Sequence, residues 1–260
     1  MFDSIFQPSK NTPQDFQESL QEWRSAQLAG KQRANIVAEK FTGVADEDGF
    51  KVIQYIEEPN TNTASRVGLS NDQLKQYSPF MDNIRKHFDD VREEAVERGL
   101  DIKYLNNYIS HVWKETPSQV EEKLRSLGKQ PYFTKERTMP TYAEGIKAGL
   151  TPKYTNPAQL AAHYNEALDR ATANKQFSDY LQKSGYLVPS SKAPLDWEPI
   201  TAKLFPKATS KLDEATLKEE FYSAPKNMAT VLNNVFDRSA NEILDTAGEI
   251  SGVHQNISLS

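Results

Sequence analysis

One stretch of regular amphipathic sequence, residues 70–98, constrains the fold more than any other feature of the chain. At about 100° per residue, its apolar side chains fall within an arc of about 120°, and charged side chains fill the rest. The apolar face continues across Pro79, so the sequence predicts one long kinked helix closed by Gly99, with a second helix starting at Pro79 as the alternative. The apolar set is Leu74, Tyr77, Phe80, Met81, Ile84, Phe88, Val91 and Ala95.

Start and stop signals place further helices along the chain. Thr12 and Pro13 predict a helix over 13–41, although Gly30 weakens its middle and allows two helices there. Asn156 and Pro157 give the same kind of start signal for a helix over 157–184 that Gly185 ends. The other predicted helices span 46–58, 117–127, 142–149, 213–222 and 225–250.

The predicted helix over 157–184 carries two apolar faces instead of one. Its first half places Leu160, Tyr164 and Leu168 on one side, whereas Phe177 and Leu181 lie on another. A helix with this pattern is either bent near its middle or packed on two sides.

The connections between helices are long and irregular. Residues 60–65 are polar and follow a proline, so we interpret them as an exposed loop. Residues 100–113 are rich in aromatic and β-branched side chains, which favours an extended segment or a short strand. Residues 186–211 hold four of the fourteen prolines and are predicted to form a packed loop.

These elements together predict a fold class and a division of the chain. The fold is mainly α: an elongated multi-helix array with long aromatic- and Pro-rich connections and room for one short strand pair. We expect an N-terminal helical segment over 1–65 and a main helical domain over 66–260.

Composition excludes several classes of protein. The chain has 260 residues, no cysteine and a formal net charge of −5. The lack of cysteine excludes disulfide scaffolds, thiolate zinc sites and thiol nucleophiles, and the acidic balance argues against general nucleic-acid binding. No run of about 18 apolar residues is present, so no membrane-spanning segment is predicted, and the first residues lack the pattern of a signal peptide.

The motifs of known catalytic and cofactor sites are also missing. No Gly-x-Gly-x-x-Gly, Walker loop, Gly-x-Ser-x-Gly elbow or HExxH occurs, so we predict no cofactor, no metal site and no catalytic residue. Adjacent carboxylates are frequent, but those in 70–98 lie on the polar side of the predicted helix. The four histidines, none of them in a metal-ligand spacing, are His87, His111, His163 and His254.

Aromatic residues and one arginine gather between residues 104 and 142. Such a set is typical of recognition surfaces and can stack nucleic-acid bases, but in a helical protein the same residues also bury an irregular segment. We favour the second interpretation and keep the first as a hypothesis. The candidate partner-binding residues are Tyr108, His111, Trp113, Arg137 and Tyr142.

The order of short motifs in and after this region resembles a known group of proteins. In chain order they are Tyr108-Ile109-Ser110-His111-Val112-Trp113, Pro131-Tyr132-Phe133, Arg137-Thr138-Met139-Pro140-Thr141-Tyr142, Gly149-Leu150-Thr151-Pro152, Asn156-Pro157 and Tyr222-Ser223-Ala224-Pro225. This order resembles helical segments of the large polyvalent, virion-associated proteins of tailed bacteriophages. There, a tyrosine-rich extended piece and a similar run lead into a long helix. The resemblance covers about residues 70–240.

The resemblance implies a non-catalytic helical module of a protein that is packaged in the virion and delivered with the genome. Its implied location is the virion interior and then the host cytoplasm, and its implied partners are other virion proteins or a host protein. Enzymatic domains of such proteins lie elsewhere in the polypeptide. Residues 252–260 end without a cap or charged tail, which fits a piece of a longer chain.

Two other functions remain open from the sequence. One is an enzyme without familiar motifs, in which His111, Arg137 and Glu144 meet in a cleft. The other is a nucleic-acid contact through a local basic patch. A deep pocket that holds two of these three side chains in contact would favour the enzyme, whereas burial of the region in a dry aromatic cluster would favour the interaction module.

Overall fold

The computed structural model describes residues 12–100, 102, 107, 109–116, 119–120, 122–123, 141–200 and 222–233. The described part is mainly helical, as predicted. Its helices are α1 (Gln14–Lys40), α2 (Asp46–Glu57), α3 (Thr61–Val67), α4 (Asn71–Glu97), α6 (Tyr142–Lys147), α7 (Pro157–Lys183) and the 3-10 turn η2 (Ser190–Lys192). Residues 226–233 are also helical.

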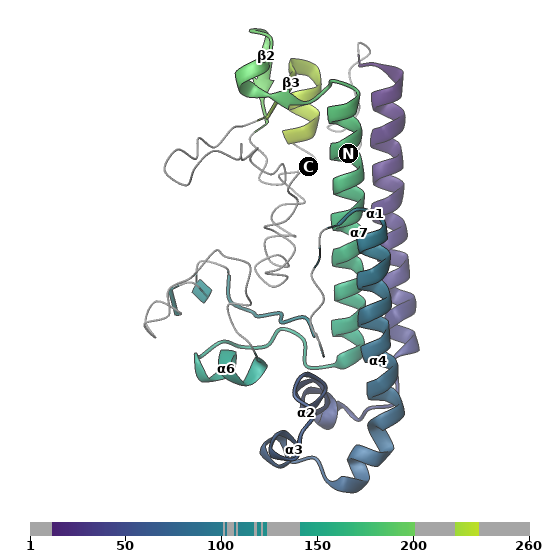
Figure 1. Cartoon of the computed structure of the whole chain (residues 1–260), viewed down its shortest axis with the longest axis vertical. Helices are drawn as coiled ribbons and strands as arrows, with labels where there is room; N and C mark the ends of the chain where they lie inside the picture. The colour runs from purple at the N-terminus through teal and green to yellow at the C-terminus, as the bar shows by residue number, and fades with distance from the viewer. Residues whose placement is uncertain are drawn as a thin grey trace, which may run out of the picture.

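Three long helices, α1, α4 and α7, give the molecule its elongated shape (Figure 1). α1 and α7 lie antiparallel over their whole length, while α4 lies beside one half of that pair. α2 and α3 lie at the end of the molecule where α4 begins, and α6 projects to one side. The other end carries a small sheet.

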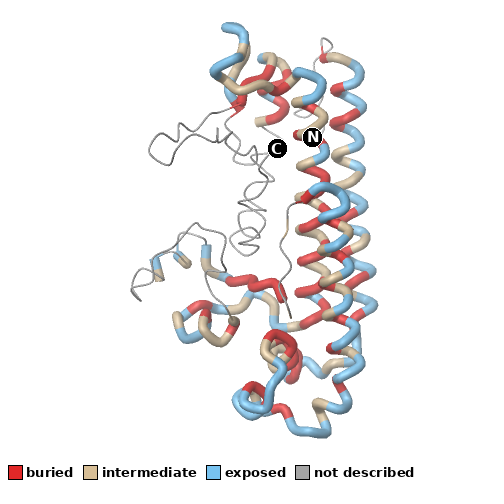
Figure 2. The backbone as a smooth tube through the Cα atoms, viewed as in Figure 1, coloured by how far each residue is buried: buried red, intermediate tan, exposed pale blue. Residues whose placement is uncertain are grey.

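Two apolar cores lie at the two ends of the α1–α7 pair, where Figure 2 shows buried backbone at both ends. The lower core joins the C-terminal half of α1 to α2, α4, α6 and the start of α7. The upper core joins the N-terminal turns of α1 to the end of α7, the sheet and residues 226–233. The predicted N-terminal segment, 1–65, therefore contributes to both cores. The upper core consists of Phe16, Leu20, Phe177, Leu181, Leu187, Ile200, Tyr222, Ala224, Met228, Ala229, Val231 and Leu232.

The two apolar faces of α7 explain how one helix serves both cores. Leu160, Tyr164 and Leu168 are buried in the lower core, whereas Phe177 and Leu181 are buried in the upper core. α7 is thus packed on two sides, which was one of the two predicted explanations. Its start and stop are also confirmed, because the Asn156 side chain accepts hydrogen bonds from two first-turn amides and Gly185 follows with a positive φ.

The long amphipathic helix and the first helix are both continuous. α4 runs through Pro79 as one helix and begins with a capping box between Ser70 and Gln73. α1 also runs through Gly30 without a break. This glycine allows α1 and α7 to pack closely at this point. A Cβ atom at Gly30 would lie 3.0 Å from the Cβ atom of Asp169 on α7.

The prediction of an exposed loop over 60–65 is wrong. These residues belong to α3, whose first turn is capped by the Asn60 side chain accepting the Thr63 amide. Thr63 and Ala64 are buried, so one side of this polar helix still packs against the protein. Gly68 ends the helix in a left-handed conformation.

The prediction of a packed loop over 186–211 is wrong in part. β1 (Val188–Pro189) and β2 (Trp197–Pro199) flank β3 (Tyr222–Pro225) in an antiparallel sheet of order β1-β3-β2. Val188 lies opposite Ser223, and Glu198 opposite Ala224. Residues 201–221 and 234–260, which hold most of the predicted helix 213–222 and the end of 225–250, lie outside the described residues.

The range 100–113 was expected to form an extended segment or a short strand, and among its described residues the strand pairing is one isolated bridge. Trp113 pairs with Pro152 in an isolated antiparallel contact. Lys114 donates its backbone amide to the carbonyl of Thr151 at 2.8 Å, and Lys153 donates to Val112 at 2.7 Å. We call residues 109–116 together with 141–153, which include α6, the strap. Its two segments are joined by these hydrogen bonds and lie beside α2.

Candidate functional site

Three of the five predicted partner-binding residues lie together in the strap, inside the lower core. His111 and Trp113 are each 6% exposed, and Tyr142 is 0% exposed. Tyr108 and Arg137 lie outside the described residues. The prediction that the aromatic region packs as a buried connection therefore fits the described part, whereas partner contact by these residues stays a prediction.

Tyr142, the first residue of α6, is the centre of this cluster. Its hydroxyl donates to the Ser110 carbonyl at 3.0 Å and accepts the Val112 amide at 3.1 Å. Because backbone groups of an irregular segment have no helix or sheet partner, a buried phenol that both donates and accepts satisfies two of them at once. This is how an irregular segment can be buried here.

Aromatic rings pack around Tyr142 on several sides. Its ring centroid lies 4.5 Å from that of His111 and 5.1 Å from that of Trp113, both at steep angles. The Phe50 ring of α2 approaches edge-on at 5.4 Å. Such tilted and edge-to-face contacts are favourable in addition to apolar burial, so the cluster is a packed assembly of rings.

Trp113 also explains a glycine in α6. A Cβ atom at Gly145 would overlap the indole ring of Trp113. Gly145 therefore lets the strap lie directly on the backbone of α6, and the pair fixes how the two pieces of the strap meet.

A buried carboxylate joins the strap to α2. One oxygen of Glu57 bonds His111 Nε2, and the other accepts the Tyr142 backbone amide at 2.9 Å. The side chains of Glu57 and His111 are both buried. A buried carboxylate is tolerated only when its oxygens are hydrogen-bonded, so burial of Glu57 depends on its hydrogen bond to His111.

The chemistry available to His111 is limited by this packing. An acid–base catalyst must reach the atom whose proton it moves, but the imidazole is buried, bonds Glu57 and packs against the rings of Trp113 and Tyr142. The neighbouring Ser110 hydroxyl makes no hydrogen bond in the described structure, so no Ser–His–Glu relay is formed. Glu144, the acid that we considered for an enzyme, lies in the first turn of α6, where its amide bonds the Thr141 hydroxyl.

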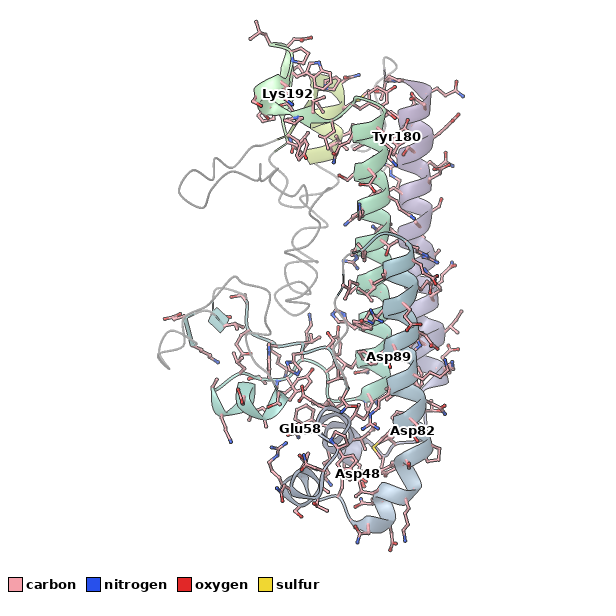
Figure 3. The ribbon with its side chains drawn as sticks, in the orientation of Figure 1. Asp48, Glu58, Asp82, Asp89, Tyr180 and Lys192 are labelled. Carbon is pink, nitrogen blue, oxygen red and sulfur yellow. The ribbon has the colours of Figure 1, made fainter. Side chains whose placement is uncertain are left out.

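A second buried carboxylate, Asp48, joins α2 to α4. It accepts from Lys51 at 2.7 Å, from Gln73 at 2.8 Å and from the Tyr77 hydroxyl at 2.9 Å. The hydrogen bond from Lys51, followed by that from Tyr77, holds the pKa of Asp48 below its usual value. Figure 3 labels Asp48 among the side chains between these two helices. Sequence reasoning missed this cluster, because its members lie in separate predicted helices.

Polar side chains also join α1 to α7 between the two cores. Arg33 pairs with the buried Asp169, which also accepts from Asn165 at 2.9 Å. Burial raises the pKa of Asp169 above its usual value, and the Arg33 guanidinium opposes part of that rise. Further along, Asn174 accepts the Trp23 indole N–H at 2.7 Å and the Gln27 amide at 3.1 Å.

The described residues offer little that resembles a ligand site. No group of three His, Asp or Glu side chains among them is placed to hold a metal ion. A pocket of about 340 Å³ lies between the end of α1 and the start of α7, lined by Phe41, Phe80 and Asn156 among others, and His111 and Tyr142 are not part of its lining. No described helix has the length and apolar character needed to cross a membrane.

Comparison with known proteins gave no relative. No protein-family model matches the chain, and no curated protein or solved structure is significantly similar to it.

Proposed function

We propose that this chain is a non-catalytic helical structural and interaction module, and that it belongs to a virion-associated protein of a tailed bacteriophage that is delivered with the genome. The geometry of the strap supports the first part of the proposal. The second part rests on the resemblance of the motifs.

One observation carries the proposal: the described motif residues make structural contacts. Thr141 and Asn156 cap α6 and α7, and Pro152 forms the bridge with Trp113. Residues Tyr222–Pro225 form the central strand of the sheet. Motifs shared for catalysis would converge on a cleft, whereas these residues hold helix ends and connections in place.

The enzyme alternative receives less support from the described residues. His111 is buried against Glu57 and two aromatic rings, which is the dry cluster that favours an interaction module. No observation in the described part favours a nucleic-acid contact. We therefore carry one proposal forward.

The virion part is tested on particles of the source virus after gradient purification and nuclease treatment. We expect peptides from this chain in the particles by mass spectrometry, and in the host cytoplasmic fraction after adsorption. Peptides that occur in infected-cell lysate but not in the particles would contradict the proposal, as would a source genome without capsid and tail genes.

The non-catalytic part is tested with two matched substitutions of His111. His111→Gln keeps an N–H donor for Glu57, whereas His111→Leu removes it; both remove the imidazole. If His111 is structural, plaque formation with His111→Gln should recover toward the wild-type level in step with its stability. Equal loss of infectivity in both variants, with His111→Gln folded, would show that the imidazole itself is required, in catalysis or in partner contact, and would contradict a purely structural role.

A further inference from the structure

The two cores are separated by a layer of the α1–α7 interface that buries few large apolar groups. On α1 this layer holds Gln27, Gly30, Arg33 and Ala34, and on α7 it holds Asp169, Thr172, Ala173 and Asn174. Its apolar members Ala34 and Ala173 are buried but belong to neither core. We call these eight residues the middle layer.

The middle layer holds the helices in register but contributes little apolar burial. Its contacts between the helices include the Arg33–Asp169 pair, the Gln27 amide and the Trp23 indole N–H on Asn174, and the close approach at Gly30. Hydrogen bonds and partly exposed ion pairs contribute less to stability than buried apolar groups of the same extent. Energetic coupling between the two cores through this layer is therefore weak.

The elements that surround the two cores also suggest that the upper core is held less firmly than the lower core. α4 packs against the lower half of α7 and ends beside the middle layer, where Arg98 lies 3.9 Å from Asp169. Above that point the described contacts of α1 and α7 are with each other and with the sheet region. Within the described residues, the lower core has 23 members and the upper core has 12.

We propose that the upper core is a separate cooperative unit that opens down to the middle layer while the lower core stays folded. In the open state the first three turns of α1 and the last turns of α7 separate, and the sheet comes away with them. Local opening of this kind occurs where few apolar contacts hold a segment. α4, α2 and the strap keep the remaining halves of α1 and α7 in place.

Native-state hydrogen exchange of the unmodified chain tests this proposal without any substitution. We expect backbone amides at 17–26 and 175–183 to share one opening reaction and to exchange at least about tenfold faster than amides at 84–95 in α4. If all three segments exchange at one common rate at every denaturant concentration, the proposal is overturned.

An engineered middle layer gives an independent test. Replacing Gln27 with leucine adds apolar contact between the cores and leaves Asn174 as the acceptor of the Trp23 indole N–H, so the difference in exchange rate should shrink severalfold, by up to about tenfold. Gln32→Leu, on the exposed side of α1, is the matched control and should leave the difference unchanged. If Gln27→Leu changes nothing although α1 and α7 remain helical, the middle layer does not separate the units and the proposal fails.

Discussion

The start of α7, in the lower core, and its end, in the upper core, are buried by different kinds of neighbours. At the lower end, α7 is surrounded by helices and by the strap, and Tyr164 stacks on Phe88 of α4 with ring centroids 4.6 Å apart. At the upper end, Phe177 meets Phe16 of α1 and a short sheet formed by segments distant in the sequence. The difference teaches that one continuous helix can serve two separate apolar cores, and the proposal above assigns these cores to units of different stability.

The largest expected effects come from removing one ring at each end. Tyr164→Ala and Phe177→Ala should each cost about 3–5 kcal/mol, because both side chains are almost fully buried. The comparison lies in where the loss appears. Tyr164→Ala should lower the free energy of global unfolding, whereas Phe177→Ala should mainly increase hydrogen exchange at 17–26 and 175–183.

The matched readout for these two variants is hydrogen exchange in α4. It should accelerate strongly in Tyr164→Ala and little in Phe177→Ala. Similar acceleration in both variants would mean that the two ends form a single cooperative unit.

The next effect concerns the buried pair that joins the strap to the lower core. His111→Leu leaves the Glu57 carboxylate without its imidazole partner, so we expect a loss of about 3 kcal/mol in urea unfolding. Combining His111→Leu with Glu57→Leu removes both polar groups and should cost less than the sum of the two single changes. Strict additivity would show that the two side chains do not interact.

A smaller effect is expected where the strap lies on α6. Gly145→Ala places a methyl group in the space of the Trp113 indole and should cost about 1–3 kcal/mol by overpacking. Trp113→Leu, itself destabilising, should make the additional Gly145→Ala change nearly neutral, because the smaller side chain leaves room. If Gly145→Ala costs as much stability in the Trp113→Leu background as in the wild type, its effect does not arise from contact with Trp113.

The smallest effect is a pH dependence at the upper end, where Tyr180 and Tyr186 donate to Asp15 of α1 (Figure 3 labels Tyr180). The hydrogen bond to Asp15, with burial, raises the pKa of Tyr186 from 10 to about 12. This contribution to stability is therefore complete below pH 10 and lost as the pH rises toward 12. The hydrogen bond from Tyr186 lowers the pKa of Asp15, so that contribution is present above its usual value and lost in acid.

The measurement is urea unfolding of the wild type and of Tyr186→Phe between pH 8 and pH 12, with far-UV circular dichroism as the signal. The difference in stability between the two proteins should vanish as Tyr186 ionises. Tyr55→Phe on α2 is the control. A constant difference across the whole range would exclude the contact with Asp15 as its source.

Local signals were enough to predict most of the helices, because their causes are local. The cap at Asn156 and the stops at Gly99 and Gly185 lie within one turn of the residues they order. α3 was missed because its polar sequence hid the Asn60 cap. A short strand pair was allowed for in the predicted fold class, and the described part contains a small sheet, but the positions of its strands were not predicted because they are two to four residues long and pair across gaps in sequence.

The candidate site was predicted only in composition. The aromatic residues of the strap were identified, and their burial was the interpretation we favoured. Glu57 was not, since a glutamate near the end of an amphipathic helix has the pattern of a surface residue and its partner His111 lies 54 positions away. Burial of a charge depends on tertiary contacts that no local pattern contains.

The burial of the strap is the claim on which the structural interpretation most depends, and Trp113 can report it directly. The chain has three tryptophans, so a variant with Trp23→Phe and Trp197→Phe leaves Trp113 as the only one. In acrylamide quenching, we predict a Stern–Volmer constant at least about fivefold below that of the urea-unfolded variant, since the indole is enclosed by Tyr142, His111 and Gly145. Quenching as strong in the folded as in the unfolded protein would show that the aromatic region lies on the surface and would contradict its role as part of the core.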